Sequence, residues 1–289
     1  TVLIPSNHLN RSSMKIIENM KKKYWALLSK RKQYWTLLSE KVRAPVLKNS
    51  GYCPTCAQEV TFVAEDAWLR DNYHCLNCGS IPRERALMLT IDSYFPNWRS
   101  LTIHESSPDN RGASRRLSQE CSQYIPSQFF LDKKPGSIVG NFRCENLETL
   151  TFADESIDLH ITQDVLEHVF HPSIVFSEIA RTLKPGGAHI FTVPIVNKHK
   201  PSKLRAQISD GGQISHLEPP IYHGNPINDD GSLVTVDWGF DICRHIFESC
   251  GLFTHIIYID DLSKGIRAEY IEVLITVKPD KIVTPNIIP

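Results

Sequence analysis

The segment FADESIDLHITQDVLEHV, residues 152–169, and the segment RTLKPGG, residues 181–187, decide the fold of this chain. The region around them contains a β-type run over residues 156–163, a helical pattern over residues 173–183 and a second β-type run over residues 187–193. Strands that alternate with helices are typical of a mainly parallel sheet. The two glycines of RTLKPGG predict a sharp turn from the helix into the second strand, with a left-handed cap.

The same alternation extends outward from this region. Helical patterns occur near residues 82–94, 113–121, 165–168 and 239–250, and β-type runs predict further strands near residues 100–104, 123–130, 139–144, 254–260 and 270–278. Only a short loop separates the last two strands, so we expect them to form an antiparallel hairpin. The sequence therefore predicts an α/β fold.

The order of these motifs resembles that of class I S-adenosylmethionine-dependent methyltransferases, specifically the methyltransferase type 11 group, whose pattern is written LPF…SFD…VLEHV…LKPGG. The resemblance covers roughly residues 98–280. It implies a Rossmann-like, seven-stranded methyltransferase sheet, with the cofactor across the carboxyl ends of the first strands, where open α/β sheets bind ligands. It also implies an enzyme that transfers the methyl group of S-adenosylmethionine.

One loop departs from the family pattern. Family members usually have a glycine-rich loop after the first strand, because glycines let the backbone approach the cofactor closely. Here the loop reads Glu105-Ser106-Ser107-Pro108, and Gly112 is the only glycine nearby. A subset of the family with an LHxxPE-like loop is similar, so we still expect the cofactor to bind.

The resemblance assigns cofactor contacts to this loop and to the end of the second strand. Glu105 is expected to bind the methionine amino group, and Ser106 and Ser107 are expected to line the loop. No acidic residue ends the second strand, so Ser127 or Gln128 would lie near the ribose.

Four further residues complete the predicted cofactor site. Asn146 and Leu147 stand where the family usually has Asp-Leu, and the side-chain carbonyl of Asn146 could accept a hydrogen bond from the adenine amino group. A simple turn is the alternative role of Asn146. Gln163 ends the strand of the first motif, and Arg83 could meet the methionine carboxylate or lie exposed on its helix.

Two pairs of cysteines have the spacing of a metal site. Cys53 and Cys56 form one CxxC pair, Cys75 and Cys78 form another, and eighteen residues separate the two pairs. This spacing matches a zinc ribbon, in which four thiolates hold one tetrahedral ion. All four positions are cysteine, so we expect a structural zinc without an open catalytic position. Two redox dithiols or two disulfides are the alternatives.

Residues 1–46 differ in character from the rest of the chain. Ten Lys or Arg residues and only two Glu lie between Arg11 and Arg43, although the net charge of the whole chain is zero. YWALLS at residues 24–29 returns as YWTLLS at residues 34–39, within apolar residues at helical spacing. We predict a basic amphipathic helix that docks on its own domain or forms a homodimer; RNA or a membrane surface is the alternative partner.

The remaining chain divides into a zinc ribbon, residues 47–81, and a methyltransferase domain, residues 82–289. In that domain, residues 195–237 form a long, irregular insertion rich in Pro, Gly and His. Loops of this length in compact domains are usually functional, so we expect a substrate lid. His223 in this lid is the predicted general base for a hydroxyl substrate, with His216 as the second candidate. A solvated surface histidine is the simpler role.

A second group of catalytic candidates lies in the first motif. Asp164, Glu167 and His168 have i, i+3 and i+4 spacing, so a helix at residues 165–168 would place two carboxylates and an imidazole on one face. A divalent cation there could acidify an acceptor hydroxyl. The element resembles the ExxEH motif of metal-dependent O-methyltransferases. The simpler interpretation is that Glu167 and His168 only pack and cap.

Composition and motifs together leave three functions. No apolar run approaches the roughly 18 residues of a membrane span, and cysteines at metal spacing indicate a reducing compartment, so we expect a cytoplasmic protein. The three functions are O-methylation of a small polyhydroxylated metabolite or sugar, methylation of an RNA base, and a non-catalytic binding protein that keeps the cofactor fold. The lid and its histidines favour the first, with a small-molecule acceptor.

Overall fold

The computed structural model describes residues 47–224 and 231–280. The predicted basic helix at residues 1–46 lies outside these described residues. Within the described part of the chain, every helix is too short or too polar to cross a membrane.

A small antiparallel sheet opens the described chain. It contains β1 (Lys48–Cys53), β2 (Gln58–Ala64) and β3 (Tyr73–Cys75) in that order, and the short helix α2 (Leu69–Asn72) precedes β3. Cys53 and Cys75 end β1 and β3, so each CxxC pair occupies the turn that follows a strand. Phe62 and Tyr73 pack with these cysteines into a separate buried cluster. The module occupies the part of the chain where the zinc ribbon is predicted.

The second sheet is large and mainly parallel. Its strands are β4 (Thr102–Ser106), β5 (Gln123–Gln128), β6 (Ile138–Val139), β7 (Phe142–Cys144), β8 (Ile157–Gln163), β9 (Leu183–Thr192), β16 (Thr254–Ile257) and β17 (Val273–Val277). They lie in the order β16-β17-β9-β8-β4-β5-β7-β6, with β9, β8, β4, β5 and β7 parallel to one another. The seven predicted strands are present, and β6 adds a short eighth strand antiparallel to β7.

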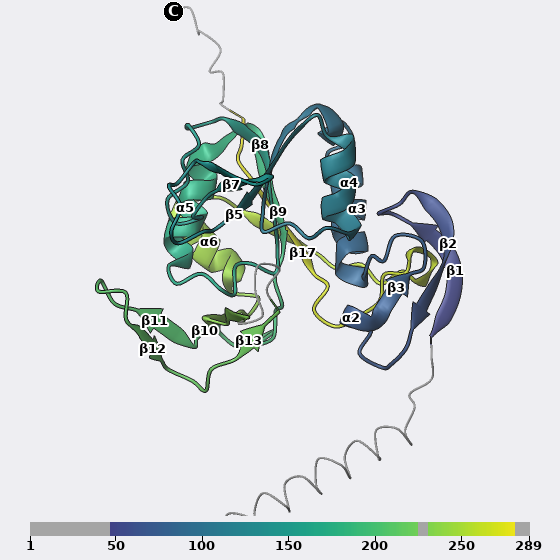
Figure 1. Cartoon of the computed structure of the whole chain (residues 1–289). Helices are drawn as coiled ribbons and strands as arrows, with labels where there is room; N and C mark the ends of the chain where they lie inside the picture. Colours follow the sequence, from purple (N-terminus) through teal and green to yellow (C-terminus); the bar gives the residue numbers. More distant parts are fainter. Residues whose placement is uncertain (1–46, 225–230, 281–289) are drawn as a thin grey trace, which may run out of the picture. The chain divides into compact units, whose positions relative to one another are not determined.

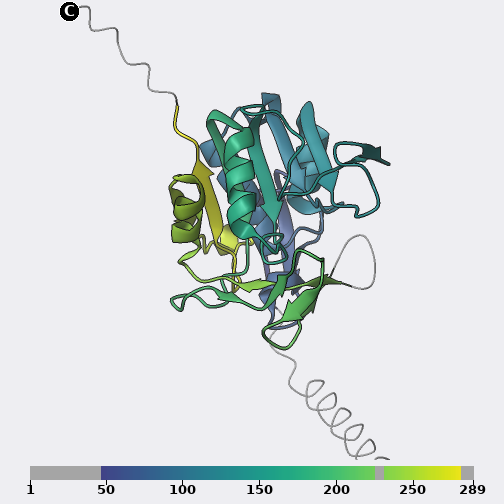
Figure 2. The ribbon, with the colours of Figure 1, turned by 90° about the vertical axis from the view of Figure 1, so that its left-hand side faces the viewer.

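Helices cover both faces of this sheet. They are α3 (Pro82–Tyr94), α4 (Gly112–Glu120), α5 (Pro172–Thr182) and α6 (Ile242–Cys250), with 3-10 turns η1 (Trp98–Ser100) and η2 (Leu262–Lys264). Figure 1 shows α3 and α4 on one side of the sheet and α5 and α6 on the other, and Figure 2 shows α5 lying across the strands. One apolar cluster lies on each side, which explains why the central strands are apolar on both faces.

The helix predicted at residues 165–168 is absent, and turns replace it. Asp164 has a left-handed backbone, with φ of 52°, so the chain changes direction directly after β8. The carbonyl of Glu167 then accepts a hydrogen bond from the Thr235 amide of the lid at 2.7 Å. The segment therefore bonds to a distant part of the chain instead of to itself.

Two further local predictions are corrected. Helix α5 ends at Thr182, and the chain already pairs as a strand at Leu183, so the left-handed Gly186, with φ of 76°, lies inside β9 and not at a helix cap. Strands β16 and β17 are antiparallel neighbours as predicted, but residues 258–272 between them are not a short loop. They contain η2, whose Leu262 carbonyl accepts a hydrogen bond from Asn49 of β1 at 2.7 Å.

The described part of the lid is more regular than predicted. It forms three antiparallel ribbons, in which β10 (Lys203–Leu204) pairs with β15 (Val236–Asp237), β11 (Ala206–Ile208) with β12 (Ile214–His216), and β13 (Tyr222–His223) with β14 (Ser232–Leu233). The chain enters this region after β9 ends at Thr192. The lid therefore leaves the sheet at the carboxyl edge of its parallel strands, as Figure 1 shows.

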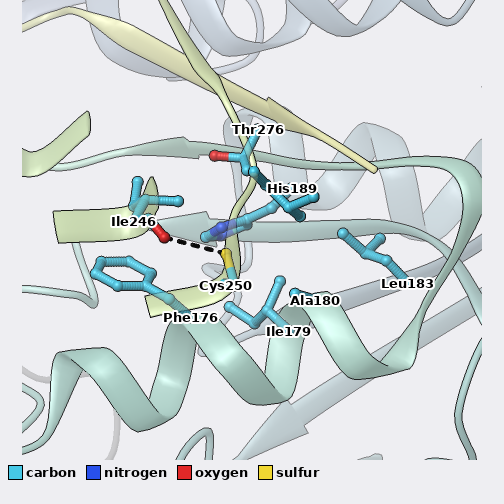
Figure 3. A pocket seen from close by; sticks show the side chains of 9 residues that line it. Phe176, Ile179, Ala180, Leu183, His189, Ile246, Cys250 and Thr276 are labelled. Carbon is cyan, nitrogen blue, oxygen red and sulfur yellow. Dashed lines mark hydrogen bonds between the residues drawn. The ribbon is translucent and has the colours of Figure 1, made fainter. Parts of the chain in front are cut away.

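A small crevice lies between α5, α6 and the sheet. Figure 3 shows that Phe176, Ile179 and Ile246 line it, with the Cys250 thiol donating a hydrogen bond to the Ile246 carbonyl. None of the predicted site residues lines this crevice. It belongs to the packing of the two helices on the sheet.

Candidate functional site

Glu105, the predicted partner of the methionine amino group, is the next-to-last residue of β4 and is completely buried. Its carboxylate accepts hydrogen bonds from Ser114 Oγ at 2.6 Å, Tyr124 Oη at 2.7 Å and Gln163 Nε2 at 2.8 Å. Burial raises the pKa of Glu105, and these three donors oppose that rise. The structure thus brings the predicted residues Glu105 and Gln163 together at the adjacent ends of β4 and β8.

Sequence reasoning missed Ser114 and Tyr124 as partners of this carboxylate. Tyr124 lies on β5, where Ile103 of β4 pairs with Tyr124 and Glu105 pairs with Pro126. The contact therefore depends on the register between two strands, and that register has no local sequence signal. Ser114 lies in the first turn of α4, so only the folded loop brings it back to β4.

The loop after β4 uses a serine where its backbone is left-handed. Ser107 has φ of 54°, and its amide donates a hydrogen bond to the Ser127 carbonyl at 2.8 Å. Few residues other than glycine adopt this conformation, so the loop keeps a glycine-like turn without the glycine. Gly112 serves another purpose, because a Cβ there would lie 2.1 Å from the buried carboxylate of Glu84.

Ser127, the predicted ribose contact, belongs to a buried chain of hydrogen bonds. Its Oγ lies 2.7 Å from His104 Nε2, His104 Nδ1 lies 2.8 Å from His160 Nδ1, and His160 Nε2 lies 2.8 Å from Thr182 Oγ1. The Thr182 hydroxyl donates to the Glu178 carbonyl, so it accepts from His160. Each imidazole then carries one proton, and the Ser127 hydroxyl donates to His104. Ser127 is therefore left to act as an acceptor toward any ligand.

Burial keeps this histidine row neutral. It lowers the pKa of His104 to about 3 and that of His160 well below its ordinary value, and it lowers the pKa of His189, which bonds to Thr162, to about 3. In the unfolded chain each imidazole titrates near pH 6.5. Below that pH the unfolded state therefore binds protons that the folded state does not.

We expect this difference to make the protein acid-sensitive. The stabilisation is fully present above about pH 6.5 and is lost as the pH falls toward the depressed folded-state pKa values. Three additional protons in the unfolded state give a slope of about 4 kcal/mol per pH unit in the free energy of unfolding between about pH 5.5 and 4. Urea unfolding across this range measures the slope. His189→Gln removes one of the three titrating imidazoles, so it should lower the slope by about one third. An unchanged slope in that variant would contradict the assignment.

The remaining predicted cofactor residues lie along the carboxyl ends of β5 and β7. Gln128 is nearly buried, and Leu147 packs in the apolar cluster beneath α5 and α6. The Asn146 side-chain oxygen accepts a hydrogen bond from the Glu148 amide at 2.9 Å, which is an Asx turn. Asn146 thus has the turn role described above, and its contact with adenine stays a prediction.

Asp164 and Arg83 pair with each other and with residues of the cysteine module. The contact of Arg83 with the methionine carboxylate stays a prediction. Asp164 pairs with Arg70 at 2.6 Å and with Arg83 at 3.0 Å, and Thr192 Oγ1 donates to it at 3.0 Å. Burial would raise the pKa of Asp164, but the two guanidinium groups outweigh it and lower that pKa. Arg83 also pairs with Asp71 at 3.0 Å. Asp164 therefore joins the cysteine module to the large sheet, and it is not a member of the group of metal-ligating side chains that includes Glu167 and His168.

A different cluster forms at the same end of β8. Glu167, His168 and His223 bring their ligating atoms within 4.8 Å of one another. Glu167 Oε1 lies 3.7 Å from His168 Nε2 and 3.6 Å from His223 Nδ1. The Glu167 side chain is 1% exposed and that of His223 is 43% exposed, so His223 is the most exposed member of the cluster. Glu167 also raises the pKa of His223.

Of the two lid histidines predicted as catalytic candidates, only His223 joins this cluster. His216 lies exposed on β12, opposite Ala206, and is absent from both groups of metal-ligating side chains that occur among the described residues. Sequence spacing could not separate the two histidines, because the pairing of β13 with β14 sets the position of His223.

The four predicted metal cysteines form the other group. Cys53 Sγ lies 3.8 Å from Cys78 Sγ, and Cys56 Sγ lies 3.9 Å from Cys75 Sγ. Sulfurs bound to one tetrahedral zinc at about 2.3 Å lie about 3.8 Å apart, so the cluster is compatible with zinc. All eight cysteines are free thiols, and these separations are far longer than a disulfide bond.

Comparison with known proteins adds the following findings. Residues 120–191, about a quarter of the chain, match the methyltransferase domain family. A solved S-adenosylmethionine-dependent methyltransferase from Mesorhizobium loti is 16% identical, with 67% of this chain and 97% of that chain covered at a TM-score of 0.43. The 1,6-didemethyltoxoflavin-N1-methyltransferase of Burkholderia thailandensis is 12% identical, with 68% of this chain and 79% of that chain covered at a TM-score of 0.41. No curated protein matches the chain.

The matched residues extend from the end of α4 to β9 and therefore include the carboxyl ends of β5, β7 and β8, where some of the predicted cofactor residues lie. Both motifs that suggested the family also lie inside this match. The family match and the mainly parallel sheet agree with each other, and together they indicate a methyltransferase enzyme that uses S-adenosylmethionine.

Proposed function

We propose that this methyltransferase transfers the methyl group of S-adenosylmethionine to a hydroxyl oxygen of a small polyhydroxylated acceptor, such as a sugar or related metabolite. The observation that carries the proposal is the cluster of Glu167, His168 and His223, which joins the end of β8 to the lid. Its exposed side belongs to His223, so an acceptor beneath the lid would meet polar groups there.

The chemistry of O-methylation explains what such a cluster would do. The hydroxyl oxygen attacks the methyl carbon, the bond between carbon and sulfur breaks, and the electron pair stays on sulfur. The hydroxyl proton must leave during this step, and a positioned polar group commonly assists its departure. In this proposal Glu167 and His223 would assist the departure of the proton, whereas Asp164 is occupied by two arginines.

The cofactor would lie across the carboxyl ends of β4, β5 and β8. The polar residues at this edge fit the cofactor. Glu105 and Gln163 lie side by side there, and the Ser127 hydroxyl oxygen can accept a hydrogen bond near the predicted ribose position. Ser106 and the left-handed Ser107 form the loop beside them. When bound, S-adenosylmethionine supplies the electrophilic methyl group.

We expect Glu105→Gln to weaken S-adenosylmethionine binding more than ten-fold, because the neutral amide loses its charge-assisted hydrogen bonds. Isothermal calorimetry with S-adenosylmethionine and S-adenosylhomocysteine measures the affinity. Glu248→Gln, an exposed change on α6, is the matched control and should bind as the unaltered chain does. Equal affinities in both variants would remove Glu105 from the site. If the unaltered chain binds neither compound at millimolar concentration, the binding-protein hypothesis replaces the enzyme.

The acceptor class can be tested with S-adenosylmethionine labelled in its methyl group. The enzyme and the labelled compound are incubated together in parallel reactions, each with one kind of acceptor: a panel of sugars and polyols, a small-molecule extract, or RNA. We expect the label in a methyl ether of low molecular mass, identified by mass spectrometry and NMR. Label in RNA or on nitrogen would contradict the proposal, and RNA labelling would revive the alternative of an RNA methyltransferase.

A further inference from the structure

The carboxylate of Glu167 has no hydrogen-bond partner for either oxygen among the described residues, although its side chain is 1% exposed. Buried carboxylates normally accept several hydrogen bonds or pair with a cation, because removal from water destabilises the charge. The ring nitrogens that face Glu167 are His168 Nε2 and His223 Nδ1, and at 3.7 and 3.6 Å both lie beyond hydrogen-bonding distance. The arrangement therefore leaves room for an atom between the three side chains.

The orientation of His168 indicates what kind of atom this is. His168 Nδ1 lies 2.8 Å from the carbonyl oxygen of Leu233, and a carbonyl can only accept, so Nδ1 carries the proton. The lone pair is then on Nε2, which lies 3.7 Å from Glu167 Oε1. An imidazole whose second nitrogen donates to a backbone carbonyl is the usual form of a histidine that ligates a metal.

The distances suit a metal ion as well. Ligand bonds of about 2.1 Å place neighbouring ligand atoms about 3.0 to 3.4 Å apart and opposite ones about 4.2 Å apart. Glu167 Oε1 lies 3.6 Å from His223 Nδ1 and 3.7 Å from His168 Nε2, and all the ligand atoms lie within 4.8 Å of one another. Small movements of the side chains would bring these distances into the range for a bound metal.

The lid holds two parts of the set in place. Leu233 and His223 belong to the paired strands β14 and β13, so one ribbon supplies both the lid ligand and the carbonyl that orients His168. The Thr235 hydroxyl donates to the Val169 carbonyl at 2.6 Å, and the Thr235 amide donates to the Glu167 carbonyl. The turn that presents Glu167 and His168 is thereby bonded to the lid.

We propose that Glu167, His168 and His223 bind one divalent transition-metal ion through a carboxylate and two imidazoles. Zn²⁺ and Mn²⁺ both accept this ligand set, which leaves coordination positions open. The inference deepens the proposed function: the acceptor hydroxyl occupies an open position, loses its proton to water as coordination lowers its pKa, and then attacks the methyl carbon. His223 in this arrangement is a ligand instead of the general base.

Direct binding of metal tests the site without reference to methyl transfer. Protein whose four-cysteine cluster has been loaded with zinc is titrated with Mn²⁺, followed by electron paramagnetic resonance and calorimetry, and its total zinc is measured after dialysis against excess Zn²⁺. We expect one Mn²⁺ per chain, displaced by Zn²⁺, and one zinc more than the cysteines hold. Glu167→Gln should weaken Mn²⁺ binding at least 100-fold and His223→Gln at least ten-fold. His199→Gln, an exposed change in the lid, is the matched control.

Thermal unfolding supplies a second measurement that does not depend on affinity. Glu167→Gln removes a buried carboxylate that has no hydrogen-bond partner among the described residues, so without metal it should raise the melting temperature, and added metal should stabilise the unaltered chain but not the variant. Binding of neither Mn²⁺ at millimolar concentration nor an additional zinc would overturn the inference, as would equal binding in all variants. Methyl ether formation by chelator-treated enzyme without such binding would overturn the cation site while leaving the proposed function intact.

Discussion

We expect Cys75→Ser to prevent folding of the four-cysteine module and to leave little soluble protein, the largest effect that we expect from a single substitution. Structural zinc sites contribute on the order of 10 kcal/mol or more to the folding of small modules, and a whole domain is typically stable by only about 5–15 kcal/mol. The loss of stability would extend from the four-cysteine module to the large sheet, because side chains of the two parts bond to each other. Arg70 bonds to Asp164, and the buried Arg85 bonds to the carbonyl oxygens of Tyr73 and Gly265.

Zinc content per chain, far-ultraviolet circular dichroism and calorimetric unfolding measure this effect. We expect one zinc per chain in the four-cysteine site before any further metal is added. Cys250→Ser is the matched control, because Cys250 is half-buried and lies outside the four-cysteine cluster. A Cys75→Ser protein that melts at the temperature of the unaltered chain, or a purified chain without zinc, would contradict the structural role.

His223→Gln is expected to lower turnover by about 10²–10⁴, the range for loss of a positioned acid or base, while cofactor affinity stays within two-fold. The reason is that His223 belongs to the lid ribbon, where it faces Glu167. The predicted cofactor residues Glu105 and Gln163 lie elsewhere, on β4 and β8. This expectation holds whether the imidazole accepts the proton or ligates a cation. Metal binding, described above, separates the two roles.

Single-turnover measurements with a saturating acceptor give the turnover effect, and calorimetry gives the cofactor affinity. His199→Gln is the control, since His199 is an exposed lid histidine that contacts only Phe240 among aromatic rings. Full activity of the His223 variant would remove this residue from the reaction, and His216 would then be the next candidate. A parallel loss of cofactor affinity would show that the effect is on the fold of the site.

The sequence determined the layered α/β architecture because each of its elements has a local signal. Helix α3 begins at Pro82 and ends at Tyr94 as predicted, and the four cysteines come together because each CxxC turn fixes two sulfurs by itself. The periodicity of a strand or helix depends on consecutive residues, so the sequence alone reveals it. The motif in β8 and the LKPGG segment suggested the order of the strands through the family that they resemble. These features identify the fold, the enzyme class and the metal-type cysteine cluster.

Tertiary structure alone decided how the site is assembled. Asp164, Glu167 and His168 were expected on one helical face, but the backbone of Asp164 is left-handed and its carboxylate pairs with Arg70, a residue that no motif indicated. His223 takes the place of Asp164 in the cluster because two lid strands pair. Such contacts join residues that are tens of positions apart in the chain, and their register depends on packing. Periodicity relates only residues that are close in sequence. It therefore identified the candidate side chains but not which of them lie in contact in the folded protein.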